Sequence, residues 1–171
     1  MTLLKNYLPE IEVLQQKIEI SELQGEPEEI ARMKLLNALE KTKGPLLIED
    51  TSLCFNAFKG LPGPYIKDFL KKLECDGLVK MLGNQTDKTA YAQTILGLAK
   101  NKKNIKLFVG KTDGEIVPPR GNDNFGWDPI FQPIGGDKTY AELGTEKNKV
   151  SHRYKAIDEM VKFLKENLDF I

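Results

Sequence analysis

The sequence of 171 residues predicts one domain of the α/β class, in which helices and strands follow one another along the chain. Three observations lead to this prediction. Segments with apolar residues at helical spacing are followed by short segments typical of strands, which are either wholly apolar or switch between apolar and polar residues. The length is that of one domain with its own core. With 40% hydrophobic and 29% charged residues, the composition excludes both a disordered chain and a membrane protein.

The N-terminal part predicts the end of a helix followed by a half-buried strand. The helix end covers residues 3–7, and Pro9 stops it. Apolar residues then alternate with polar ones, as in a strand with one buried face. These apolar positions are Ile11, Val13, Ile18 and Ile20.

A helix that begins at Pro27 is the clearest element of the chain. Proline suits the first helical position, and apolar residues recur at helical spacing as far as Leu39. Gly44 and Pro45 end the element. The apolar run 46–48 then predicts a short buried strand with two acidic residues at its carboxyl end.

The middle of the chain predicts two helices and a sheet. The apolar spacing over 66–73 predicts an amphipathic helix, and a second, shorter helix follows from Asp76. The segments 89–99 and 105–111 predict strands. Asp113-Gly114 predicts a hairpin turn into a further short strand, because this dipeptide favours the tight turns of hairpins.

The C-terminal part predicts a loop-rich segment and a last helix. The segment 118–136 contains the only tryptophan, and Ser151 is a favourable N-cap for the helix that follows. The apolar stripe of this helix consists of Tyr154, Ile157, Val161 and Leu164.

Composition excludes several classes of function. With 25 basic and 25 acidic residues the net charge is zero, which disfavours nucleic acid as a general partner. Cys54 and Cys75 cannot build a disulfide framework, and with His152 as the only histidine a Cys/His zinc site is excluded. Any metal therefore needs oxygen ligands. No apolar leader, membrane span, Gly-x-Ser-x-Gly elbow or Walker phosphate loop occurs, and we expect a cytoplasmic protein without membrane partners.

Acidic residues provide the first candidate site. Glu49 and Asp50 follow a predicted strand, and adjacent carboxylates on a rigid element suit Mg²⁺ or the activation of a water molecule. The alternative is a turn with two solvated acids. Glu22 is a candidate third oxygen ligand, or simply a surface acid.

Basic and aromatic residues extend this candidate site. Lys34 and Lys67 lie on predicted helices, where ammonium groups suit phosphate oxygens, although most helical lysines are only solvated. In the loop 124–129, aromatic rings suit stacking on a nucleobase; the alternative is a plug on a small core. His152 and Arg153 offer hydrogen-bond donors to a base carbonyl, or are surface residues after a helix cap. Together these groups suit a nucleoside triphosphate with Mg²⁺.

Five ordered motifs make the sequence recognisable. They occupy residues 22–27, 47–51, 60–67, 125–129 and 146–153. In this order and spacing the chain resembles the Ham1-like family of inosine triphosphate pyrophosphatases, its eukaryotic members most closely, from about Lys17 almost to the C-terminus. Five motifs in one order are far more specific than any single motif.

The resemblance implies a fold and a reaction. The fold would be α/β, with a long curved mixed sheet flanked by helices and two lobes around a central cleft, usually in a homodimer. The reaction would be the hydrolysis of ITP, dITP and XTP to the monophosphate and pyrophosphate with Mg²⁺, or alternatively Mn²⁺. Such an enzyme removes deaminated purines from the nucleotide pool.

The resemblance also implies residue roles. Glu22 and Asp50 would hold the metal, and Asp50, with Glu49 beside it, would accept the proton of the attacking water. Lys34 and Lys67 would contact the triphosphate. Thr51 would line the site, and the remaining substrate-binding residues would be Phe125, Gly126, Trp127, Asp128, Lys147, His152 and Arg153.

The N-terminus differs from that pattern. Members of the family begin with a buried strand and a Thr-Gly-Asn-x-x-Lys loop that holds phosphates, whereas residues 1–171 start within the following helix. We therefore expect a single domain, truncated at its N-terminus, that lacks the first strand. The alternative to an active enzyme is a catalytically impaired nucleotide-binding homologue.

Overall fold

The computed structural model describes residues 11–20, 23–121 and 126–171. These residues form a five-stranded sheet with the order β2-β1-β3-β4-β5, flanked by helices. The strands are β1 (Leu46–Phe55), β2 (Pro62–Gly63), β3 (Thr89–Asn101), β4 (Asn104–Ile116) and β5 (Phe131–Pro133). The helices are α2 (Pro27–Leu39), α3 (Ile66–Leu82), α4 (Tyr140–Leu143), α5 (Lys147–Val150) and α6 (His152–Glu166), with 3₁₀ turns at Asn56–Phe58, Asp128–Ile130, Gly144–Glu146 and Leu168–Phe170.

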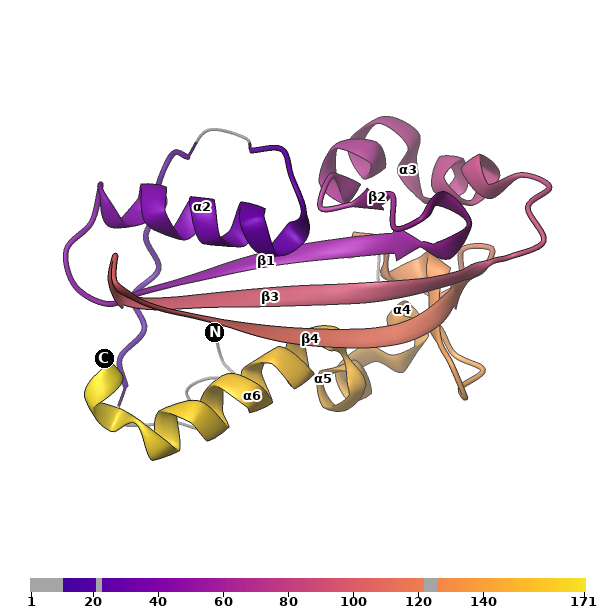
Figure 1. The fold of residues 1–171 in the computed structure, drawn as a ribbon. Helices are drawn as coiled ribbons and strands as arrows, with labels where there is room; N and C mark the ends of the chain where they lie inside the picture. Colours follow the sequence, from indigo (N-terminus) through magenta and orange to yellow (C-terminus); the bar gives the residue numbers. More distant parts are fainter. Residues whose placement is uncertain (1–10, 21–22, 122–125) are drawn as a thin grey trace.

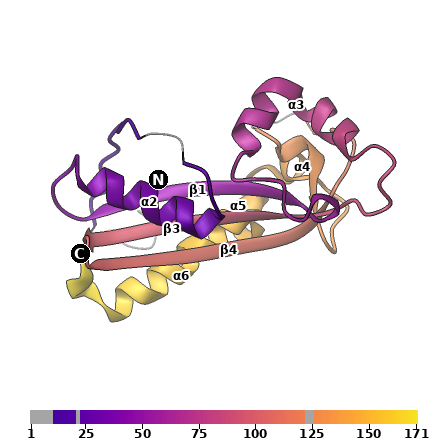
Figure 2. The same cartoon turned by 45° about the horizontal axis from the view of Figure 1, so that its top comes forward.

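Two lobes are built on one long sheet (Figures 1 and 2). Helix α2 covers one face of β1 and β3, and α6 covers the opposite face of β3 and β4. Helices α3 and α4 lie together at the other end of the strands. Each lobe has its own core: Leu96, Phe108 and Met160 belong to the core under α6, while Leu78, Trp127 and Tyr140 belong to the core at the α3 end. The predicted α/β fold with two lobes is confirmed.

The pairing of the strands differs from the expected mixed sheet. All four strand pairs among the described residues are antiparallel. A parallel pair requires a crossover between two strands, such as a helix with a strand at each end. Residues 11–20 precede α2 but form no strand, although Ile11, Val13, Ile18 and Ile20 are half-buried as the alternation predicts. The predicted helix end at 3–7 lies outside the described residues.

The predicted hairpin turn at Asp113-Gly114 is wrong. Strand β4 runs through both residues, and its turn with β3 lies at 101–104 instead. Gly114 is required for another reason: a Cβ at this position would lie 2.5 Å from the carbonyl oxygen of Gln132 on β5. The glycine permits close approach of a neighbouring strand, which the sequence pattern does not distinguish from a turn.

Three other helical predictions are close to the structure. Helix α2 starts at Pro27 as predicted. Helix α3 is interrupted at Glu74, whose φ of 57° is not helical, so the second helical segment begins at Cys75, one residue earlier than predicted. Helix α6 starts as predicted, because the Ser151 hydroxyl accepts a hydrogen bond of 3.2 Å from the backbone N–H of Tyr154. Within the described ranges, none of the helices has the length and apolar character needed to cross a membrane.

Candidate active site

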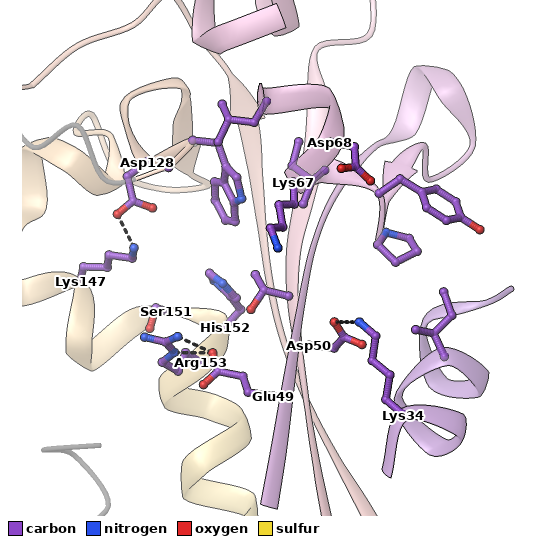
Figure 3. A pocket seen from close by; sticks show the side chains of 18 of the residues that line it. Lys34, Glu49, Asp50, Lys67, Asp68, Asp128, Lys147, Ser151, His152 and Arg153 are labelled. Carbon is purple, nitrogen blue, oxygen red and sulfur yellow. Dashed lines mark hydrogen bonds and ion pairs between the residues drawn. The ribbon is translucent and has the colours of Figure 1, made fainter. Parts of the chain in front are cut away.

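A cavity of about 600 Å³ lies where the two lobes meet. Its walls come from α2, β1, the start of α3, the loop around Trp127, α5 and the start of α6. Figure 3 shows basic and acidic side chains directed into this space from both sides of β1. Helices and loops that are far apart in the sequence thus bring charged groups into one cavity, as in many ligand sites.

The cavity gathers every predicted site residue that the structure describes. These residues are Lys34, Glu49, Asp50, Thr51, Lys67, Gly126, Trp127, Asp128, Lys147, His152 and Arg153. Glu22 and Phe125 lie outside the described residues, so their predicted places remain predictions.

The sequence predicted Glu49 and Asp50 at the end of a strand. In the structure they lie within it. Strand β1 continues to Phe55 and pairs with β3 along its whole length. Because side chains alternate across a strand, the two carboxylates point to opposite faces of the sheet. Glu49 faces α6 and Asp50 faces α2 (Figure 3). The two acids therefore do not form one paired carboxylate site.

Asp50 is held by one cation and keeps one free oxygen. Its Oδ1 accepts a hydrogen bond of 2.8 Å from the Lys34 ammonium on α2. Its Oδ2 is buried and has no hydrogen-bond partner among the described residues. A buried carboxylate oxygen without a hydrogen-bond partner destabilises the fold. This atom is therefore the clearest candidate in the cavity to bind a ligand, a proton or a cation.

Glu49 positions Arg153. Its Oε1 accepts a hydrogen bond of 2.6 Å from Arg153 Nε and also pairs with Nη2 of the same side chain. This ion pair joins β1 to the start of α6. Because only two of the five guanidinium N–H groups are used there, the others remain as donors toward the cavity.

The lysines of the cavity differ in their partners. The Lys67 ammonium points into the cavity from the start of α3 and has no ion-pair partner among the residues described (Figure 3). Lys147 pairs with Asp128, and its ammonium lies 5.0 Å from the centre of the Tyr140 ring. Lys67 is therefore the cation most readily available to an anionic ligand.

His152 is positioned by a close approach of two backbones. A Cβ at Gly110 of β4 would lie 1.9 Å from the carbonyl oxygen of His152, so only glycine lets α6 start at this depth. The histidine is 4% exposed. Burial, helped by the positive charges of Lys147, Arg153 and Lys155, lowers the pKa of His152 to about 3. The imidazole is therefore neutral at physiological pH, with one N–H donor.

Trp127 is a core residue as well as a wall of the cavity. It is 8% exposed and contacts the Phe131 ring edge-on, with ring centres 5.7 Å apart. Its indole also stacks on the His152 ring. The sequence left open whether this loop stacks on a base or plugs a core; burial of the indole favours the core role, with the stacked imidazole facing the cavity.

The stability of the fold should fall in mild acid because of His152. The folded-state pKa of about 3 lies below the ordinary value of 6.5, so the unfolded chain binds the proton more readily. This contribution is fully present above pH 6.5 and is lost at about 1.4 kcal/mol per pH unit as the pH falls toward 3. Between pH 7.5 and pH 5 we expect a loss of about 2 kcal/mol from this group.

Urea unfolding of the wild type and of His152→Gln at both pH values measures this loss. The variant removes the titrating group, so its unfolding free energy should change less between pH 7.5 and pH 5. Equal pH dependence in the two proteins would contradict the burial of a neutral histidine.

Several lining residues were not predicted as site residues. They include Leu23, Pro64, Tyr65, Asp68, Asn148 and Ser151. Tyr65 connects the lobes, since its hydroxyl accepts a 3.1 Å hydrogen bond from the backbone N–H of Gly25. Gly25 and Tyr65 lie within two of the five ordered motifs, at 22–27 and 60–67, so membership of these motifs is the signal in the sequence that could have identified them.

Three comparisons relate the chain to known proteins. A model of the Ham1 family matches residues 2–163. The Ham1 protein of Staphylococcus aureus is 28% identical, with a TM-score of 0.83 over 97% of this chain and 93% of that one. A HAM1 protein from Coxiella burnetii is 26% identical, with a TM-score of 0.86 over 96% of this chain and 92% of that one.

A third solved structure carries a description of its activity. It is a nucleoside-triphosphatase / dITP/XTP pyrophosphatase from Mycobacterium abscessus, 26% identical, with a TM-score of 0.71 over 86% of this chain and 82% of that one. The family match covers nearly the whole chain, and the structural matches extend over both lobes. The chain belongs to the Ham1 family.

Proposed function

We propose that this protein hydrolyses ITP, dITP and XTP to the monophosphate and pyrophosphate. The broader enzyme class, a nucleoside triphosphate pyrophosphohydrolase, is confirmed by the family match and by similarity to the Mycobacterium abscessus enzyme. The observation that carries the proposal is the division of the cavity: Lys34, Lys67 and Asp50 lie on one side, and the neutral His152 lies with Arg153 on the other.

The lysine side suits a triphosphate. Lys34 and Lys67 reach the cavity from two different helices, and ammonium groups bind phosphate oxygens as point charges. Lys34 is paired with Asp50 before a nucleotide binds. We infer that the phosphates compete for this lysine, which frees the Asp50 carboxylate to accept a proton from the attacking water.

Mg²⁺ fits this side when it arrives with the nucleotide. The described residues contain no group of three His, Cys, Asp or Glu side chains that forms a preformed metal site. Mg²⁺ does not require one, because in nucleotide enzymes it is held by one or two carboxylates together with phosphate oxygens and water. The buried, unpartnered Oδ2 of Asp50 suits this role, with Glu22 as the proposed second ligand. When bound, the ion supplies positive charge that stabilises the developing charge on the phosphates.

The donor side suits a purine with a keto group. A neutral imidazole N–H and the unused guanidinium N–H groups are donors, and a base carbonyl is an acceptor. Hypoxanthine and xanthine present a keto oxygen where adenine presents an amino group. The cavity therefore favours the deaminated purines, and removal of their triphosphates would cleanse the nucleotide pool.

Product analysis tests the proposal. With ITP and Mg²⁺, we expect IMP and pyrophosphate in equal amounts, measured by ³¹P NMR, and no reaction when EDTA replaces Mg²⁺. Release of orthophosphate and IDP would contradict cleavage between the α and β phosphates. Thermal stabilisation by ITP without any product would instead support the impaired nucleotide-binding homologue. The homodimer and the cytoplasmic location stay predictions.

A further inference from the structure

The ring of His152 packs against two aromatic side chains, which also contact each other with ring centres 6.2 Å apart. The Trp127 ring stacks on it at an interplanar angle of 30°, with centres 5.4 Å apart. The Tyr140 ring stacks on it at 19°, with centres 5.7 Å apart. Tyr140 is completely buried and His152 is 4% exposed, so the imidazole belongs to a packed cluster of three rings.

One nitrogen of this imidazole faces the tyrosine hydroxyl. The Nδ1 atom of His152 lies 3.4 Å from Tyr140 Oη. His152 lines the cavity and Tyr140 does not, so Nε2 is the nitrogen left for a ligand. A neutral imidazole carries its single proton on one nitrogen, and the hydrogen bond at the other nitrogen decides which.

The surroundings of Tyr140 favour donation from its hydroxyl to Nδ1. Burial raises the pKa of this hydroxyl to about 12, so it keeps its proton. Its oxygen accepts a hydrogen bond from the backbone N–H of His152. The Thr112 side chain is also hydrogen-bonded to this hydroxyl, and its own proton is donated to the Val150 carbonyl oxygen at 3.2 Å, which leaves the Thr112 oxygen as a second acceptor. The phenol proton thus has two acceptors within reach, Nδ1 of His152 and Oγ1 of Thr112, and the more basic imidazole nitrogen is the stronger of the two.

We propose that Tyr140 is a positioning residue for base selection: its hydroxyl holds His152 with the proton on Nε2, so the cavity presents a fixed donor to a purine keto oxygen. The part that concerns the purine rests on the proposed function. The contact between Tyr140 and His152 does not depend on the proposed function. Tyr140 lies outside the cavity, and its role is to select the tautomer of the residue that lines it.

Because His152 is the only histidine, NMR tests the tautomer directly. In the uniformly ¹⁵N-labelled wild type at pH 7.5, a long-range ¹H–¹⁵N correlation spectrum should show one imidazole, with the protonated-type shift on Nε2. In Tyr140→Phe, which removes only the hydroxyl, the spectrum should move toward the other tautomer or a mixture. A wild-type proton on Nδ1 would overturn the proposal, even if the variant failed to fold.

Tyr91→Phe is the matched control for this experiment. Tyr91 is a half-buried tyrosine of β3, and its hydroxyl bonds to Cys54, away from His152. The imidazole signals of this variant should match those of the wild type. An equal change in both variants would overturn the assignment to Tyr140.

Kinetics then separate a positioning role from a merely structural one. In Tyr140→Phe we expect kcat/KM for ITP to fall about tenfold, mainly through KM, with kcat/KM for ATP nearly unchanged, because only a keto base uses the donor. An equal loss for ITP and ATP would overturn the role in selection. If the wild type failed to hydrolyse ITP, the proposed function would fail, and the NMR result would still decide whether Tyr140 sets the tautomer.

Discussion

Asp50→Asn is expected to lower kcat for ITP by about a thousandfold or more, because it removes a general base and part of the metal-binding charge at once. The amide keeps the size of the side chain and an oxygen for Lys34, which donates to Oδ1 at 2.8 Å in the wild type. It places an N–H₂ group at the position of the unpartnered Oδ2. The fold should therefore survive while turnover at saturating Mg²⁺ and ITP collapses.

Asp113→Asn is the matched control for this prediction. Asp113 lies on the same sheet and also pairs with a lysine, Lys111, at 3.2 Å, but it is exposed and lies outside the cavity. Its kcat should stay within about twofold of the wild type, since exposed ion pairs contribute little. Melting temperatures of both variants verify folding. Unchanged turnover in folded Asp50→Asn would remove Asp50 from the proposed chemistry.

The second large effect concerns the base. We expect ITP to be cleaved at least about a hundredfold more efficiently than ATP, compared as kcat/KM. Adenine would turn its amino group toward the donors of His152 and Arg153, and each donor that the bound base covers and leaves unpaired costs roughly 1 to 3 kcal/mol. XTP, which carries the same keto oxygen, should behave like ITP. Equal efficiencies for ATP and ITP would contradict this account of the cavity.

Arg153→Gln tests how much the guanidinium of Arg153 contributes to the preference for ITP over ATP. The ratio of kcat/KM for ITP over ATP should fall at least about tenfold, because the donors held in place by Glu49 are lost. Lys155→Gln removes a cation from the same helix whose ammonium donates to the Lys111 carbonyl oxygen and does not line the cavity. This control should keep the wild-type ratio, and a fall in both variants would indicate a general effect of charge.

Local sequence patterns determined much of the secondary structure. Pro27 and the apolar spacing after it predicted α2, and Ser151 predicted the start of α6 through its capping hydrogen bond. These features depend on residues within one or two turns of each other. Where the partner was distant, the same reasoning failed: Gly114 predicted a turn, but it is required by the approach of β5.

The sequence also determined which residues line the candidate site. The ordered motifs contain ten of the predicted residues of the cavity, from Glu49 to Arg153, and Lys34 was predicted from its place on the helix that begins at Pro27. Motifs identify residue types in a fixed order, and a shared fold brings them together. The motifs did not include Tyr140, which acts on the cavity only through its contact with His152.

Only the tertiary structure decided how these groups are arranged and paired. The strand β1 separates Glu49 from Asp50, because neighbouring side chains of a strand point to opposite faces. Helix α6 then supplies Arg153 to one acid, and helix α2 supplies Lys34 to the other. The state of His152 depends on burial beneath Trp127 and Tyr140. Helix starts and motif residues depend on neighbours in the sequence, so the sequence alone predicted them. Ion pairs, burial and tautomers depend on groups that are distant in the sequence, so only the tertiary structure decided them.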